Sequence, residues 1–270
     1  MQGVSLQVAA GEFLGIVGKT GSGKTTLVQH FNGLLKPSAG NVYVEGRNLA
    51  DPGISWSELR RRVGLVFQYP EHQLFAETVF EDIAFVLGQQ KAFSPEEIEG
   101  RVRYVCGMVG LDYDSFRRRS PFGLSGGEMR RAALAGVFVQ DPSILILDEP
   151  TVGLDGPGKR ELLRQIGILH RLGKTIIIVS HAVEDLADRV DRLMVMEEGR
   201  IVTSGEPGEV FAQLVAMKKF NFLVPPVFQL CGDLRAAGWT LPDRVFQTEE
   251  ALAAIDRNLG EGRHAPGMEN

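Results

Sequence analysis

The chain has 270 residues, of which 44% are hydrophobic and 23% charged, a composition typical of an ordinary soluble globular protein. Its formal net charge of −5 argues against non-specific nucleic-acid binding, so no nucleic-acid partner is expected. No apolar run approaches the roughly 18 residues of a membrane span, so any membrane role must be peripheral. Cys106 and Cys231 form no CxxC motif, which favours a reduced setting over a disulfide scaffold.

The hydrophobic pattern predicts an α/β fold with a mainly parallel sheet. Continuous apolar runs at 143–150 and 175–181 are typical of strands buried on both faces, and a helical stretch near 157–172 supplies the crossover between them. Shorter strands are expected at VSLQV, EFLGIV, NVYVEG and VGLVF. A mainly helical insertion is expected between about 69 and 140, with a helix start at Ser94-Pro95-Glu96-Glu97. The alternation of strand and helix patterns ends at about residue 205, and a polar, frayed tail is expected at 261–270.

A phosphate-binding loop is predicted between the EFLGIV strand and the helix after it. The segment matches G-x-x-x-x-G-K-[ST], in which glycines let backbone amides turn toward phosphate oxygens. Lys24 is expected to reach the β- and γ-phosphates, and the Thr25 hydroxyl is expected to face Mg²⁺. The predicted phosphate ligands are Gly18, Lys19, Thr20, Gly21, Ser22, Gly23, Lys24, Thr25 and Thr26.

Two further segments fit the same chemistry. The strand ILIL ends in Asp148, which could hold Mg²⁺ from the far side, and Glu149 could polarise an attacking water. Taken alone, this pair of acids could equally be the start of a loop. Ser125-Gly126-Gly127-Glu128 opens a helix whose N-terminus could bind an anion, although Ser125 and Glu128 also form a capping box.

Gln68 stands between the strand VGLVF and a helix expected from Thr78. The ten residues between them, broken by a proline, would pass for an ordinary surface loop in an arbitrary protein. His181, after an apolar strand, would likewise pass for an ordinary loop residue. The arginine clusters at 60–62 and 117–119 read as solvated faces.

Six motifs occur in the order found in ABC ATPases: GKTGSGKTT, the Gln68 loop, LSGGE, ILILDEP, GLD at 153–155 and His181. The resemblance covers roughly residues 3–210. Within that superfamily, FQYPEHQLFAETVFEDIAF, Ser120-Pro121-Phe122 and RRAALAG resemble the ATPases of energy-coupling factor (ECF) transporters, as does the C-terminal stretch 221–255.

The resemblance implies an ATP-hydrolysing subunit, with Mg²⁺, that drives an importer of vitamins or of cobalt or nickel ions from the cytoplasmic membrane face. It implies Thr25, Gln68 and Asp148 as metal-site residues, with Glu149 as base and His181 at the γ-phosphate. It also implies a head-to-tail dimer, in which each ATP meets the P-loop of one chain and Ser125, Gly126 and Gly127 of the other. Asp155 would help join the two sites.

The resemblance further implies partners and domains. A second ATPase chain, identical or different, would join a membrane-embedded coupling subunit and a substrate-capture subunit. The segment after Gln68 would contact the membrane subunit. The expected division is an ATP-binding domain at 1–205, with a helical subdomain at about 69–140, followed by an extension at 206–260 for dimer contact. Two alternatives stay open: an ATPase of another ABC importer family, and a soluble non-transport ABC ATPase.

The chain departs from the family pattern at four places. LSGGE replaces LSGGQ, but glutamate and glutamine can both close the capping box. Ala182 and Gly156 stand where aspartate and proline are usual. Only 17 residues precede Gly18, where the family usually has another strand and an aromatic that stacks on adenine. Either the recorded start lies downstream of the true one, or the base is held differently.

Overall fold

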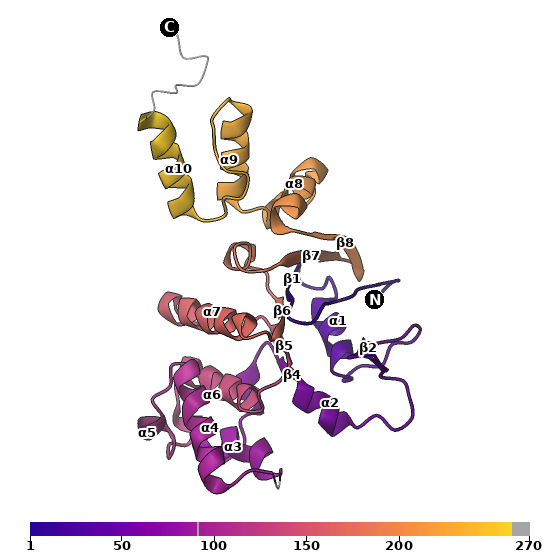
Figure 1. The fold of residues 1–270 in the computed structure, drawn as a ribbon, viewed down its shortest axis with the longest axis vertical. Helices are drawn as coiled ribbons and strands as arrows, with labels where there is room; N and C mark the ends of the chain where they lie inside the picture. Colours follow the sequence, from indigo (N-terminus) through magenta and orange to yellow (C-terminus); the bar gives the residue numbers. More distant parts are fainter. Residues whose placement is uncertain (91, 261–270) are drawn as a thin grey trace. The chain divides into compact units, whose positions relative to one another are not determined.

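The structure is a computed structural model that describes residues 1–90 and 92–260 (Figure 1). It divides into two compact units: the first comprises residue 1, 5–13 and 24–179, and the second comprises 2–4, 14–23 and the chain from 180 onward. The chain of the first unit runs through α1 (Lys24–Phe31), β2 (Tyr43–Val44), β3 (Arg47–Asn48), α2 (Trp56–Arg62), β4 (Val63–Val66), η1 (Pro70–Gln73), α3 (Val79–Gly88), α4 (Pro95–Met108), α5 (Tyr113–Phe116), η2 (Pro121–Gly123), α6 (Gly126–Phe138), β5 (Ile144–Asp148), α7 (Gly156–Arg171) and β6 (Thr175–Val179).

Three parallel strands form the sheet of the first unit, in the order β4, β5, β6. Val66 is in register with Leu147, and Asp148 with Val179. The strands consist largely of Val, Ile and Leu and are buried on both faces, as expected from their continuous apolar runs. Because parallel strands end at the same edge of a sheet, the loops that follow β4 and β5 start side by side.

The helices α3, α4, α5 and α6 form a group of their own, drawn in purple to magenta in Figure 1. Three of them begin with a complete capping box, at Thr78 and Glu81, Ser94 and Glu97, and Ser125 and Glu128. In each box the serine or threonine hydroxyl accepts the backbone N–H of the glutamate, and the glutamate carboxylate accepts the backbone N–H of the cap residue. The helix starts expected at Thr78, Ser94 and Ser125 are therefore confirmed.

The second unit contains most of β1 (Phe13–Val17), β7 (Arg192–Glu197) and β8 (Arg200–Gly205). β1 pairs with β7 in parallel, and β7 pairs with β8 antiparallel. The remaining elements are η3 (Val183–Asp185), α8 (Pro207–Met217), η4 (Asn221–Leu223), α9 (Pro226–Ala236) and α10 (Thr248–Gly260). Helices α9 and α10 pack together around Cys231, Leu241, Val245 and Ala254.

Some expected elements differ in the structure. VSLQV forms no strand within the described residues 1–90, although its side chains alternate between half-buried and exposed; alternation predicts a buried face but supplies no pairing partner. The β7–β8 hairpin was not predicted; its turn, Glu198-Gly199, has positive φ at both residues without the usual Asn-Gly signal. The tail at 261–270 lies outside the described residues.

Among the described residues, no helix combines the length and the apolar character needed to cross a membrane. Both cysteines are unpaired and buried.

Candidate active site

Positive φ angles at three glycines shape the loop between β1 and α1. Gly18, Gly21 and Gly23 have φ of 149°, 81° and 100°, a region that favours glycine. A Cβ on Gly18 would also lie 2.2 Å from the carbonyl oxygen of Met196, so no larger residue fits there. Such left-handed turns before a helix form a concave nest of backbone N–H groups that suits phosphate.

Two buried polar side chains belong to this loop and the helix that follows. Ser22 is 4% exposed, and its hydroxyl makes no hydrogen bond within the described part of the chain, which suits a group that meets a phosphate oxygen. Lys24 is the first residue of α1 and is 7% exposed. Burial lowers the pKa of Lys24, whereas the nearby Glu149 and Asp148 favour its charged form. Lys19, Thr20 and Thr26 are exposed.

A short hydrogen bond joins the start of α1 to the end of β5. Thr25 Oγ1 donates to Asp148 Oδ2 at 2.7 Å. Burial raises the pKa of Asp148, and the neighbouring Glu149 adds to this, while the Thr25 bond acts in the opposite direction. A hydroxyl and a carboxylate are hard oxygen donors, so this pair fits Mg²⁺ beside a phosphate.

Glu149 sits on a strained backbone directly after β5. Its φ is 51°, the left-handed region that costs a non-glycine residue roughly 1–2 kcal/mol. The residue is 8% exposed. Its N–H donates to Val179 O at 2.9 Å, and its carbonyl oxygen accepts from Val152 N at 3.3 Å. Strain of this kind persists where the surroundings fix it, and it gathers at active sites.

Arg130 also binds the Glu149 carbonyl, and our sequence reasoning missed this residue. Its Nη2 donates to Glu149 O and to Gln68 O, both at 2.8 Å, and its Nη1 donates to Val152 O. Arg130 is 4% exposed. The available signal was its place two residues before the apolar run AALAGVF of the same helix, where a buried arginine requires fixed acceptors.

The Gln68 loop begins at the same sheet edge as Asp148, since Val66 pairs with Leu147. The Gln68 side chain is exposed. The structure thus brings Thr25, Lys24, Asp148 and Glu149 together, with Gln68 at the same edge through its carbonyl contact with Arg130.

The other candidates lie at helix starts or after strands. Ser125 is the N-cap of α6, and Gly126 and Gly127 form its first turn. Asp155 is the N-cap of α7, where its carboxylate accepts from Gly158 N at 2.9 Å. This local duty was not expected. His181 is exposed and follows β6 in the chain by two residues.

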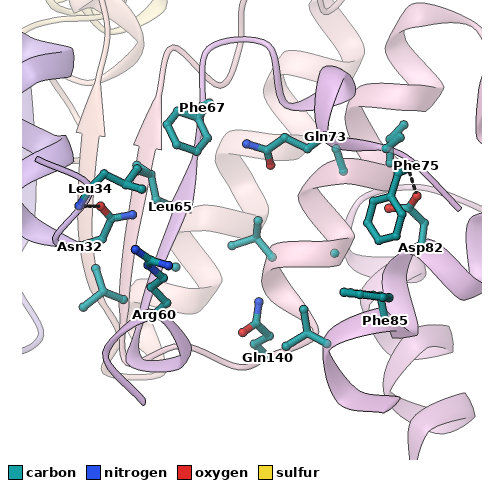
Figure 2. Close-up of a pocket in the computed structure, with 17 residues that line it drawn as sticks. Asn32, Leu34, Arg60, Leu65, Phe67, Gln73, Phe75, Asp82, Phe85 and Gln140 are labelled. Atoms are coloured by element: carbon teal, nitrogen blue, oxygen red, sulfur yellow. Dashed lines mark hydrogen bonds between the residues drawn. The ribbon is translucent and has the colours of Figure 1, made fainter. Parts of the chain in front are cut away.

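A groove of about 370 Å³ opens beside the Gln68 loop (Figure 2). Its apolar lining includes Leu34, Leu65, Phe67, Phe75, Phe85 and Val137. Asp82 fixes one side, because its Oδ2 accepts from the N–H groups of Phe75 and Ala76, each at 2.8 Å. Phe75 then meets Phe85 edge to face, with ring centres 4.8 Å apart, although both remain exposed at 58% and 45%.

Comparison with known proteins places these features in context. Residues 1–152 match the family model described as ABC transporter. The energy-coupling factor transporter ATP-binding protein EcfA2 of Symbiobacterium thermophilum is 49% identical over 260 residues, covering 96% of this chain and 89% of that protein. EcfA2 of Clostridium perfringens is 46% identical over 262 residues, covering 96% and 92%.

Two solved structures share the fold. One is cbiO1 from Clostridium perfringens, described as part of the ABC transporter complex cbiONQ, with a TM-score of 0.70, 35% identity and coverage of 87% of this chain and 91% of that one. The other is the dimeric ATP-binding cassette MJ0796 bound to ADP and Pi, with a TM-score of 0.68, 28% identity and coverage of 75% and 88%.

Proposed function

This chain belongs to the ABC transporter family, among the energy-coupling factor transporter ATP-binding proteins, and from that premise we propose how its residues hydrolyse ATP and reach a membrane partner. It is an ATP-binding and ATP-hydrolysing subunit of a transporter. This favours the ECF reading over another importer family and over a soluble non-transport ATPase.

The hydrolytic step is assigned to Glu149. The water oxygen attacks the γ-phosphorus, the bond from that phosphorus to the bridging oxygen of ADP breaks, and the Glu149 carboxylate takes the proton of the water. The observation that carries this assignment is the 2.7 Å bond between Thr25 and Asp148, next to which Glu149 sits on its strained backbone. His181 contacts the γ-phosphate.

Phosphate and metal are held by the loop and its neighbours. The nest formed by Gly18, Gly21 and Gly23 and the side chains of Ser22 and Lys24 bind the phosphates, with Lys19, Thr20 and Thr26 at the border. Thr25, Gln68 and Asp148 hold Mg²⁺, which supplies charge neutralisation at the phosphates when bound. The oxygen donors at Thr25 and Asp148 support this choice of metal.

A second ATPase chain completes each site. Ser125, Gly126 and Gly127 at the N-terminus of α6 meet the γ-phosphate held by the other chain, and Asp155 joins the two sites. The dimeric MJ0796 cassette supports this arrangement. We place the domain boundary at about 205, with residues 206–260 in dimer contact. Leu230, Leu252 and Leu259 on α9 and α10 are about half exposed, which suits a covered face.

The groove beside the Gln68 loop receives a helix of a membrane-embedded coupling subunit. Its apolar lining and exposed aromatic rings suit an amphipathic helix laid across it. Glu77, exposed on the same loop, can attract basic residues of that subunit. The chain then sits peripherally on the cytoplasmic membrane face. A separate substrate-capture subunit selects the cargo, a vitamin or a cobalt or nickel ion.

Filling the groove tests the docking. Gly136 of α6 lines the groove, and a Cβ added there meets nothing within 4 Å. Gly136→Gln should fold well, because glutamine is a better helix former than glycine. Gly107→Gln is the matched control, since Gly107 is an exposed glycine of α4 with equally open surroundings.

Both variants are co-expressed with the coupling and substrate-capture subunits of an energy-coupling factor transporter and recovered through a tag on the chain. We expect Gly136→Gln to lose the membrane subunits while the free protein hydrolyses ATP normally, and Gly107→Gln to retain both properties. If Gly136→Gln recovers the membrane subunits as well as the control does, the groove is not the docking site.

A further inference from the structure

Arg130 ties together two loops of the first unit, the one after β4 and the one between β5 and α7. Its guanidinium donates to Gln68 O after β4, to Glu149 O after β5, and to Val152 O in the turn before α7. All three acceptors are backbone carbonyls, so their positions depend on the paths of the loops and not on side-chain rotamers. The arginine itself starts from α6, a helix anchored by its capping box.

Arg130 donates to the carbonyl oxygen of Glu149, a residue whose backbone conformation is strained. The φ of 51° at Glu149 is sterically unfavourable, and hydrogen bonds to both the N–H and the carbonyl oxygen of the residue hold it. On the N–H side the acceptor is Val179 O, within the sheet. On the carbonyl side the donors are Val152 N, at a long 3.3 Å, and Arg130 Nη2, at 2.8 Å. Arg130 is therefore the stronger support, because hydrogen bonds from an ionised donor are the shorter and stronger kind.

Groups of the Gln68 loop offset the effect of burial on the charge of Arg130. Burial lowers the pKa of Arg130, and Glu71, Tyr69 and Glu149 favour its charged form, Glu71 most strongly. Glu71 belongs to η1, which packs against α6, and one of its carboxylate oxygens is buried and accepts no hydrogen bond from the described residues. The charge of Arg130 thus attracts the same loop that its guanidinium binds through Gln68.

We propose that Arg130 is a positioning residue for ATP hydrolysis, which holds the Gln68 loop, the Glu149 peptide and the Val152 turn as one assembly and so aims the Glu149 carboxylate at the attacking water. The inference rests on the proposed role of Glu149 as base. The same helix α6 lines the partner groove with Ala133, Gly136 and Val137, one to two turns further on. The assembly therefore connects the docking groove to the catalytic residue.

The planar fork of arginine is required for this role. Three carbonyls from two loops are reached by two nitrogens held at fixed angles, a geometry that a lysine ammonium cannot reproduce on its single nitrogen. Arg130→Lys keeps the charge, and Arg130→Met keeps an unbranched, flexible side chain without any donor. Arg103→Met is the matched control, because Arg103 lies on α4 of the same unit, half exposed, and pairs with Asp114 on the surface.

The test separates ATP binding from turnover in the purified full chain. Misplacement of a catalytic group by about 1 Å can cost about 10²-fold in rate. We expect Arg130→Met and Arg130→Lys to lower kcat about 10²-fold per folded, nucleotide-binding molecule, with the Kd for ATP within about twofold of the native value. Hydrogen exchange should rise together in segments 68–73 and 149–154. Arg103→Met should leave kcat, Kd and exchange unchanged.

Two results would overturn the proposal: a kcat for Arg130→Lys within about twofold of native, or an unchanged exchange rate in both segments. Arg130→Lys carries the test if Arg130→Met fails to fold. Glu149→Gln is measured in parallel, so that failure of the base role of Glu149 can be distinguished from failure of the positioning role of Arg130. An active Glu149→Gln removes the base assignment, whereas an inactive Glu149→Gln beside an active Arg130→Lys removes only the positioning role.

Discussion

Asp82 holds the loop that carries Phe75 and Ala76 beside the groove. Removing its carboxylate should therefore shift the opening equilibrium of that loop by an amount that can be estimated. One carboxylate oxygen accepts the N–H groups of both Phe75 and Ala76 at 2.8 Å. Thr78 and Glu81 cap helix α3 independently, so the helix start survives the loss of Asp82. Asp82→Ala should therefore loosen the loop around Phe75 without unfolding α3.

The magnitude follows from two hydrogen bonds to a charged acceptor. Such bonds contribute about 1.5–3 kcal/mol each, and the half-exposed position of Asp82 reduces this to about 1 kcal/mol each. The loop should lose about 2 kcal/mol, which corresponds to about a 30-fold change in its opening equilibrium. Asp82→Asn keeps one neutral acceptor oxygen and should lose about half of this free energy, or about fivefold.

Hydrogen exchange of the Phe75 and Ala76 amides measures the opening directly. In Asp82→Ala these two amide hydrogens should exchange about 30-fold faster than in the native protein. In Asp82→Asn their exchange rates should lie between those of the native protein and Asp82→Ala. The amides inside α3, such as that of Leu87, serve as the internal reference and should not change. Equal exchange at Phe75 and Ala76 in all three proteins would refute the view that Asp82 orders the groove.

Two further predictions concern buried ionisable groups. Because burial raises the pKa of Asp148, the folded state binds its proton more tightly than the unfolded state, so stability falls as pH rises from about 3.9 through the raised pKa. Asp148→Asn should therefore raise the Tm of the nucleotide-free protein at pH 7.5 while abolishing hydrolysis, and an unchanged or lower Tm would count against this. Burial raises the pKa of Cys106 to about 11, so at pH 8 a maleimide should label it about 100-fold more slowly than an ordinary cysteine, and labelling should accelerate in urea. Rapid labelling of the native protein would show that Cys106 is accessible.

The parts of the site that the sequence predicts correctly are those encoded locally. The glycine spacing from Gly18 to Gly23 dictates positive φ angles, and the capping boxes dictate where α3, α4 and α6 begin. Continuous apolar runs indicate buried strands, and such runs predict β5 and β6 correctly. Each of these signals lies within about ten residues of chain.

The parts that escaped prediction depend on partners far apart in the chain. Arg130 binds carbonyls 62, 19 and 22 residues away, and nothing in its own neighbourhood indicates them. Asp82 reads as an ordinary acid in the first turn of a helix, because its bonds to the loop depend on how that loop folds back. Glu71 lies in the segment after Gln68 that was expected to contact the membrane subunit, but it is half-buried near Arg130, which leaves the exposed Glu77 as the better candidate for that contact.

Glu149→Gln tests the central claim most directly, because it preserves the shape of the side chain and removes only the base. The measurement is steady-state ATP hydrolysis, with bound nucleotide and oligomeric state followed on the same sample. We predict that turnover falls by about 10²-fold or more, ATP stays bound, and an ATP-bound dimer accumulates. Near-native turnover in Glu149→Gln would contradict the account, because the proton of the attacking water would then have another acceptor.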